Sequence, residues 1–215
     1  MLPDITPIAP VRIVAPFDHP DCLYEIKYDG WRCMTRIEAG VVQLLSRKQN
    51  QYKSFPALAA ALAKLSVKDA IIDSELVVLD SEGKSVFLDL MRRRKSEAVL
   101  ACFDLLVCDG VDLRQLPLLE RKARLRQLIR GCDRTLYVDH VEAKGVELFK
   151  AICAKDMEGI VCKHKDAPYT SRPTVCWKVL NPDYSAKRNR KEMFENFRDR
   201  GQAIKIKTDR ATVSK

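Results

Sequence analysis

The chain has 215 residues, of which 47% are hydrophobic and 31% are charged, and its formal net charge is +9. This makeup is typical of a folded protein with a sizeable core, and it excludes a disordered or collagen-like chain. No segment is long and apolar enough to cross a bilayer, and residues 1–20 lack the pattern of a secretory signal, so we expect a cytoplasmic protein with no membrane partner.

Residues 1–20 contain five prolines, which predicts an extended strap on the surface of the domain. Further along, short segments rich in β-branched residues predict strands at 41–46, 70–79, 99–108 and 159–162. Segments with apolar residues three and four apart predict helices at 55–65, 118–129 and 145–154.

Short turns at residues 38–40 and 80–83 favour antiparallel pairing of the strands that they join. The sequence therefore predicts an α+β fold, with antiparallel β-sheets flanked by helices, over residues 1–184. Residues 185–215 are predicted to form a separate basic appendage, with one helix at about 191–199 and a frayed end.

This appendage carries ten Lys and Arg residues against four Asp and Glu residues, so it holds +6 of the net charge. A basic segment suits a polyanionic partner, because binding to phosphates releases counterions. A solubilising tail explains the same charge, and both interpretations stay open. The eight cysteines fall singly with no Cys-x-x-Cys pair, so we expect buried, reduced thiols in place of a disulfide framework or a zinc site.

The most informative segment is residues 25–32, Glu-Ile-Lys-Tyr-Asp-Gly-Trp-Arg, at the predicted end of a strand and a tight turn. A lysine between carboxylates and an arginine is often only a surface ion-pair cluster. Five further short segments follow it in a fixed order, and the set of six carries the functional interpretation. They are Ser46-Arg47, residues 72–76 (Ile-Asp-Ser-Glu-Leu), residues 102–106 (Cys-Phe-Asp-Leu-Leu), residues 158–163 (Glu-Gly-Ile-Val-Cys-Lys) and residues 177–181 (Trp-Lys-Val-Leu-Asn).

This ordered set resembles the signature motifs of the covalent nucleotidyltransferases, and it is most similar to the ligase domain of bacterial ATP-dependent DNA ligases that act in end joining. The resemblance implies the ATP-grasp-like nucleotidyltransferase fold of those ligases. It also implies that Lys27 attacks ATP and carries AMP as a covalent lysine adduct. A lysine that attacks phosphorus must be an uncharged amine, so nearby cations would both favour that form and stabilise charge on the α-phosphate. Arg32, Lys163 and Lys178 are the candidates.

The resemblance assigns further roles around Lys27. Asp29 is expected to orient the lysine or a metal-bound water, and Glu158 is expected to hold Mg²⁺ or Mn²⁺. Glu75 and Arg32 are expected to bind the ribose hydroxyls of the nucleotide. Phe103 and Val161 are expected to enclose the adenine ring, with Glu25 and Ile26 beside its edge.

Taken singly, these residues have simpler interpretations. Phe103 and Val161 lie in apolar strands and could be ordinary core residues. Asp73 and Glu75 could form a solvated edge of a strand. Only the ordered set of motifs favours the functional interpretation.

The later steps of ligation pass AMP to a DNA 5′-phosphate and then join the strands. By resemblance, Ser46 and Arg47 are expected to face nicked or broken DNA, because a guanidinium group binds phosphate oxygens in a fork. Such a protein is expected to work in the cytoplasm, at the nucleoid.

The sequence departs from the family pattern at three points. Leu180 stands where a second lysine of the last motif is expected, and Lys165 or another nearby Lys or Arg is a candidate to replace that cation. Ser74 stands where glycine is commoner. Only about thirty residues follow the last motif, so we expect no C-terminal oligonucleotide-binding barrel (OB-fold) in this chain, and a partner protein could supply one.

Two functional classes follow. The first is an ATP-dependent DNA ligase or its stand-alone adenylation domain; within this class an RNA ligase or a capping-type nucleotidyltransferase is less favoured. The second is a nucleic-acid-binding module that keeps the ligase fold but is weakened in catalysis, which Leu180 and the short C-terminal segment favour.

Overall fold

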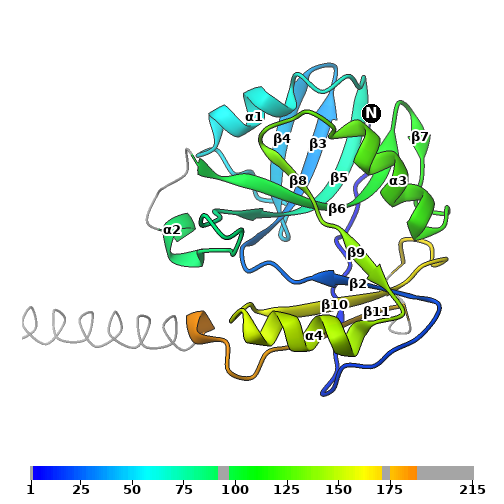
Figure 1. The fold of residues 1–215 in the computed structure, drawn as a ribbon. Helices are drawn as coiled ribbons and strands as arrows, with labels where there is room; N and C mark the ends of the chain where they lie inside the picture. The colour runs from blue at the N-terminus through cyan, green and yellow to red at the C-terminus, as the bar shows by residue number, and fades with distance from the viewer. Residues whose placement is uncertain (1, 92–96, 171–174, 188–215) are drawn as a thin grey trace, which may run out of the picture. The chain divides into compact units, whose positions relative to one another are not determined.

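The computed structural model describes residues 2–91, 97–170 and 175–187, and Figure 1 shows their arrangement. Contacts between residues divide the chain into two units, residues 1–181 and 182–215. The helices and strands named below all belong to the first unit. The helix expected at 191–199 lies outside the described residues.

The first sheet has five strands in the order β1-β11-β10-β2-β9. Their bounds are β1 (Val11–Arg12), β2 (Cys22–Ile26), β9 (His140–Glu142), β10 (Gly159–His164) and β11 (Cys176–Leu180). Helix α4 (Gly145–Ala154) covers one face of this sheet, on the side away from the second sheet (Figure 1). Its Ile152 is buried with Tyr24 and Cys162 in the core of this layer.

The second sheet has six strands, in the order β4-β3-β5-β6-β7 with β8 beside β6. Their bounds are β3 (Trp31–Glu38), β4 (Val41–Ser46), β5 (Asp69–Val77), β6 (Val99–Cys108), β7 (Val111–Asp112) and β8 (Thr135–Tyr137). Helices α1 (Pro56–Leu62) and α3 (Leu118–Leu128) contribute Leu58, Leu62 and Leu125 to the core of this layer. A short helix, α2 (Phe87–Met91), follows the turn after β5.

The predicted strands and helices correspond to β4, β5, β6, β10, α1, α3 and α4. The predicted α+β fold, with antiparallel sheets flanked by helices, is confirmed; in addition β1 pairs with β11 and β6 pairs with β8 in parallel, so both sheets are mixed. The short strands β1 and β8 are connected to their partners by long segments of chain. Such pairings cannot be predicted from short turns in the sequence.

Of the N-terminal strap predicted at residues 1–20, residues 2–10 have no regular structure and are anchored to the second sheet, whereas Val11–Arg12 form β1. Leu2 and Ile5 are buried in a cluster with residues of β3, β5 and β6. The guanidinium group of Arg36 donates to the main-chain oxygens of Pro3 at 2.7 Å and Leu2 at 2.8 Å. These contacts explain how a proline-rich segment without regular hydrogen bonding keeps a fixed path.

Gly30 forms the turn between β2 and β3, where the chain passes from one sheet to the other. A Cβ atom at this position would lie 2.2 Å from the main-chain oxygen of Leu76 and 2.8 Å from a side-chain carbon of Val77. The turn therefore requires glycine because of close backbone approach. This approach fixes how the segment after β2 meets strand β5.

Candidate nucleotide-binding site

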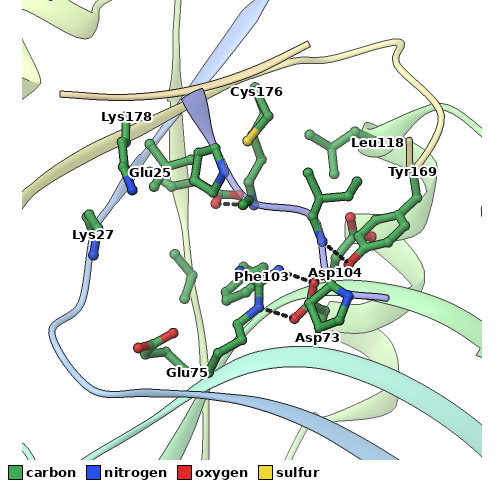
Figure 2. A pocket seen from close by; sticks show the side chains of 18 of the residues that line it. Glu25, Lys27, Asp73, Glu75, Phe103, Asp104, Leu118, Tyr169, Cys176 and Lys178 are labelled. Carbon is green, nitrogen blue, oxygen red and sulfur yellow. Dashed lines mark hydrogen bonds and ion pairs between the residues drawn. The ribbon is translucent and has the colours of Figure 1, made fainter. Parts of the chain in front are cut away.

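A cavity of about 230 Å³ lies among strands of both sheets. Figure 2 shows Lys27 and Lys178 at one end, Tyr169 at the other and Phe103 between them. One side is formed by the N-terminal strap, through residues 7–10. Ten of the thirteen residues predicted for the site line this cavity: Glu25, Ile26, Lys27, Arg32, Arg47, Glu75, Phe103, Val161, Lys163 and Lys178.

The side chain of Lys27 is paired with a carboxylate. Its Nζ lies 2.6 Å from Oε2 of Glu158, and both side chains are only about one-fifth exposed, at 22% and 17%. The pairing follows from the sheet, because Lys27 and Glu158 directly adjoin β2 and β10, which are antiparallel neighbours. The main-chain N–H of Lys27 donates to the oxygen of Gly159 at 2.9 Å. The sequence predicted Glu158 as a metal ligand near Lys27, and in the structure its carboxylate pairs with the lysine itself.

Glu75 lies opposite Arg32 in the pairing of β3 with β5. Burial raises the pKa of Glu75 to about 7, although the positive charges of Lys27 and Arg32 act in the opposite direction. The carboxyl group therefore changes its charge near neutral pH, inside the cavity.

Arg32 is held by a buried carboxylate. Its Nε and Nη2 donate to the two oxygens of Asp73, each at 2.5 Å, and Asp73 is fully buried. The hydroxyl group of Tyr169 also donates to Asp73, at 2.7 Å, and accepts from the main-chain N–H of Ile8 at 3.1 Å. The solvated-edge alternative is therefore wrong for Asp73, which links the strap to the arginine that lines the cavity.

A second ionic cluster surrounds Glu25, which is 2% exposed. One carboxylate oxygen lies 2.6 Å from Nζ of Lys122 and the other lies 2.5 Å from Nζ of Lys163. Burial by itself would raise the pKa of Glu25, but the two lysines hold it below its ordinary value. The Nζ of Lys163 also lies 4.5 Å from the centre of the Phe103 ring, a cation–π distance.

Sequence reasoning missed Lys122 and the neighbouring Arg121, which is paired at 2.8 Å with Asp104. Both are almost completely buried on α3, at 1% and 2% exposure. The signal that could have found them is their spacing, because positions 121 and 122 fall between Leu118 and Leu125 on the apolar face of the helix. Charged residues at such positions need partners inside the protein.

Three predicted residues do not line the cavity. Glu158 is paired with Lys27, which does line it. Asp29 is buried, and its main-chain N–H donates to Oγ of Ser85 at 2.9 Å. The Oγ of Ser46 accepts from the main-chain N–H of Asn50 at 3.1 Å, so it stabilises the turn after β4.

Lys165 does not replace the lysine that is missing from the last motif. Its Nζ lies 3.5 Å from Asp21 and donates to the main-chain oxygen of Pro20 at 3.1 Å, and the residue does not line the cavity. Leu180 pairs with Gly159 in the first sheet. The cations expected around Lys27, which are Arg32, Lys163 and Lys178, all line the cavity, as do Arg47 and Arg121.

All eight cysteines are free, as predicted, but only Cys22, Cys33, Cys102 and Cys162 are buried, and the other four are partly exposed. In the part of the chain that the structure describes, no helix has both the length and the hydropathy of a membrane span. Within the same residues, no three His, Cys, Asp or Glu side chains are grouped as a ready-made metal site.

Residues 1–178 match the family model described as "ATP dependent DNA ligase domain". The chain is 36% identical over 161 residues to the "Multifunctional non-homologous end joining protein LigD" of Pseudomonas aeruginosa. The aligned residues cover 72% of this chain and 19% of that protein. It is 29% identical to the "SPbeta prophage-derived DNA ligase-like protein LigB" of Bacillus subtilis, over 84% of this chain and 69% of that protein. This chain thus spans about a fifth of the length of the first of these relatives.

Solved structures agree with the sequence matches. A structure described as "mycobacterial DNA ligase D complexed with ATP and MES" is similar with a TM-score of 0.70 and 25% identity, over 81% of this chain and 60% of that chain. The ligase domain of LigD from M. tuberculosis gives a TM-score of 0.68 and 26% identity, over 80% and 58% of the two chains. The fold and the matched motifs place this chain in the family of ATP-dependent DNA ligase domains.

Proposed function

We propose that this chain is the adenylating domain of an ATP-dependent DNA ligase, with Lys27 as the residue that takes AMP. The observation that carries this proposal is the position of Lys27 at one end of a cavity that also gathers Arg32, Lys163, Lys178 and Glu75. Residues 1–184 form this domain in the proposal. The basic segment 185–215 adds a grip on the phosphate backbone that does not depend on sequence.

In the proposed reaction, Nζ of Lys27 forms a bond to the α-phosphorus of ATP. The bond from that phosphorus to the oxygen bridging the β-phosphorus breaks, and pyrophosphate leaves with this oxygen. Lys27 must first lose a proton, and Oε2 of Glu158, at 2.6 Å, is the acceptor within reach. Lys163 and Lys178 stabilise the charge that develops on the phosphate oxygens.

The remaining lining residues fit the rest of the nucleotide. Glu75 and Arg32 lie beside each other on adjacent strands, where a carboxylate and a guanidinium group suit ribose hydroxyls. Nε and Nη2 of Arg32 already donate to Asp73, so the arginine approaches the nucleotide with the other edge of its guanidinium group. Phe103 and Val161 provide apolar surface for the adenine ring, and Glu25 and Ile26 lie along the same cavity.

A divalent ion, Mg²⁺ or Mn²⁺, fits the donor chemistry of the site. Glu158 offers carboxylate oxygens beside Lys27, and triphosphate oxygens would supply further hard ligands. Asp29 would orient Lys27 or a water on the ion from the turn that follows. When bound, such an ion offsets the negative charge of the phosphates.

After adenylation, AMP passes from Lys27 to the 5′-phosphate of nicked or broken DNA, and the 3′-hydroxyl displaces it. Arg47, which lines the cavity directly after β4, is suited to the 5′-phosphate, with Ser46 shaping its turn. The relatives named LigD and LigB support DNA as the substrate. We place this activity in the cytoplasm at the nucleoid, with an OB-fold partner protein completing the grip on the duplex.

The test is intact mass after incubation with ATP and Mg²⁺. We expect the native chain to gain one AMP, and Lys27→Ala to gain none. Lys150→Ala, which removes an exposed lysine on α4, is the matched control and keeps the adduct. A native chain that shows no adduct under conditions where it binds ATP would refute the proposal.

A second candidate is a nucleic-acid-binding module that keeps the fold without adenylation. Leu180 favours it, because this position offers no second cation to the phosphates. Binding of nicked duplex with steep salt dependence and without any AMP adduct would support this candidate. Parallel sealing assays on nicked DNA and nicked RNA, together with a GTP arm in the mass experiment, separate DNA ligase from RNA ligase and capping-type activity.

A further inference from the structure

Lys122 is a buried lysine that the proposed chemistry does not use. Its side chain is 1% exposed, and the residue lies on α3, which packs against β6 of the second sheet. Its Nζ donates to Oε1 of Glu25 at 2.6 Å and to the main-chain oxygen of Val138 at 2.8 Å, and it lies 4.7 Å from the centre of the Tyr137 ring. The ammonium group thus has an anion, a carbonyl and an aromatic face as partners.

The two lysines that hold Glu25 reach it from different places. Lys163 lines the cavity, as does Glu25, whereas Lys122 is not part of the cavity wall. Lys163 binds the second carboxylate oxygen, Oε2, and its side chain is 13% exposed. A ligand in the cavity can therefore displace Lys163 from Oε2, while Lys122 stays in place behind Oε1.

A buried carboxylate needs a counterion to stay charged in a medium of low dielectric constant. If Lys163 turns towards the phosphates of a nucleotide, Glu25 keeps Lys122 as its buried partner. Oε2 then faces the cavity as a charged acceptor with a fixed direction. A charged acceptor binds a donor such as an amino group and repels the lone pairs of a carbonyl oxygen.

We propose that Lys122 is a positioning residue that holds Glu25 as a fixed acceptor for the amino group of a purine base in the cavity. The inference rests on the proposed binding of ATP, and it adds a residue on α3 to the determinants of base selectivity. Lys122 touches neither the nucleotide nor the reacting phosphate in this arrangement. It acts through Glu25 alone.

The test compares two nucleotides that differ in one group, ATP and purine riboside 5′-triphosphate, which lacks the 6-amino group. Binding is measured by isothermal titration calorimetry in a Lys27→Ala background, so that no AMP transfer takes place. We expect Lys27→Ala to bind ATP at least about tenfold more tightly than the purine analogue, which is the scale of one hydrogen bond to a charged group. We expect the additional Lys122→Met change to reduce this ratio to about twofold or less.

The ratio of the two affinities separates a positioning role from a structural one, because general damage to the domain weakens the binding of both nucleotides equally. Lys122→Arg keeps a cation beside Glu25, and we expect it to restore most of the discrimination. Lys150→Met on α4 is the matched surface control and leaves the ratio unchanged. Circular dichroism melts check folding, and Lys122→Gln, which can still donate to Val138, replaces Lys122→Met if that variant does not fold.

A Lys122→Met or Lys122→Gln variant that folds and keeps the native ratio would overturn the inference, and so would a Lys27→Ala chain that does not discriminate between the two nucleotides. Neither result would touch the adenylation of Lys27, which intact mass reports separately. A chain that binds ATP selectively but never forms the adduct would refute the proposed function and leave the role of Lys122 standing.

Discussion

The Nζ atom of Lys27 and the Oε2 atom of Glu158 lie 2.6 Å apart at one end of the cavity. The two residues are 131 positions apart in the chain and meet because β2 and β10 are neighbours in one sheet. This contact fixes the direction of the lysine side chain. Any transfer of a nucleotide to Lys27 must break the pair.

We predict that Glu158→Ala lowers the rate of lysine adenylation by roughly 100-fold or more, the scale of losing one preorganised electrostatic group. The variant loses both the proton acceptor beside Lys27 and the carboxylate proposed for the metal ion. The measurement is a time course of AMP adduct by intact mass. Glu147→Ala, at an exposed position of α4, is the control, and a Glu158→Ala rate within a few-fold of this control would contradict the assignment.

We predict that Glu75→Gln stabilises the protein at high pH and not at low pH. The pKa of Glu75 is raised from 4.5 to about 7 in the folded protein. Below pH 4.5 the carboxyl group is therefore protonated in both the folded and the unfolded protein, and it does not lower the free energy of unfolding. Between these values the folded state binds more protons than the unfolded state, and stability falls as the pH rises. Above pH 7 the full penalty, roughly 3 kcal/mol, is present.

Urea denaturation of the native chain and Glu75→Gln at pH 4.5, 6 and 8.5 checks this prediction. The difference in unfolding free energy between the two should grow with pH and level off above pH 7. A constant difference would mean that Glu75 does not change its charge in this range.

We predict that Gly30→Ala destabilises the domain by about 2 kcal/mol or more, because the new methyl group would overlap the main-chain oxygen of Leu76. Gly40→Ala is the matched control. Gly40 has a φ of +80° but no atom within 4 Å of an added Cβ, so its cost is about 1 kcal/mol of backbone strain. Thermal melts of both variants measure the difference in their loss of stability. Equal losses of stability would rule out the close approach at Gly30.

We predict that Tyr169→Phe loosens the N-terminal strap. The change removes the donor to Asp73 and leaves the main-chain N–H of Ile8 without the acceptor that it has at 3.1 Å. The expected cost is about 1–2 kcal/mol of stability, with faster hydrogen exchange at Ile8. Tyr52→Phe, which loses a longer bond of 3.3 Å to the main-chain oxygen of Arg32, is the control and should leave exchange at Ile8 unchanged.

The sequence by itself determined the family, seven of the fifteen described helices and strands, and the lysine at the centre of the proposed chemistry. Short motifs such as residues 25–32 and 158–163 could be recognised because their residue types and order are local properties of the chain. The helices could be predicted from apolar spacing alone, since α3 and α4 each bury one face. The turn at Gly30 was equally clear in the sequence, although the reason for its glycine was not.

Only the tertiary structure decided which charges meet. Lys122 pairs with Glu25 across 97 residues, Arg32 pairs with Asp73, and Lys165 turns away to Asp21. The parallel pairings of β1 with β11 and of β6 with β8 were equally hidden. The physical reason is the same for the ion pairs and for the strand pairings. The partner of a buried charge or of a strand depends on how distant segments of the chain pack together, and that packing cannot be inferred from the spacing of residues in the sequence.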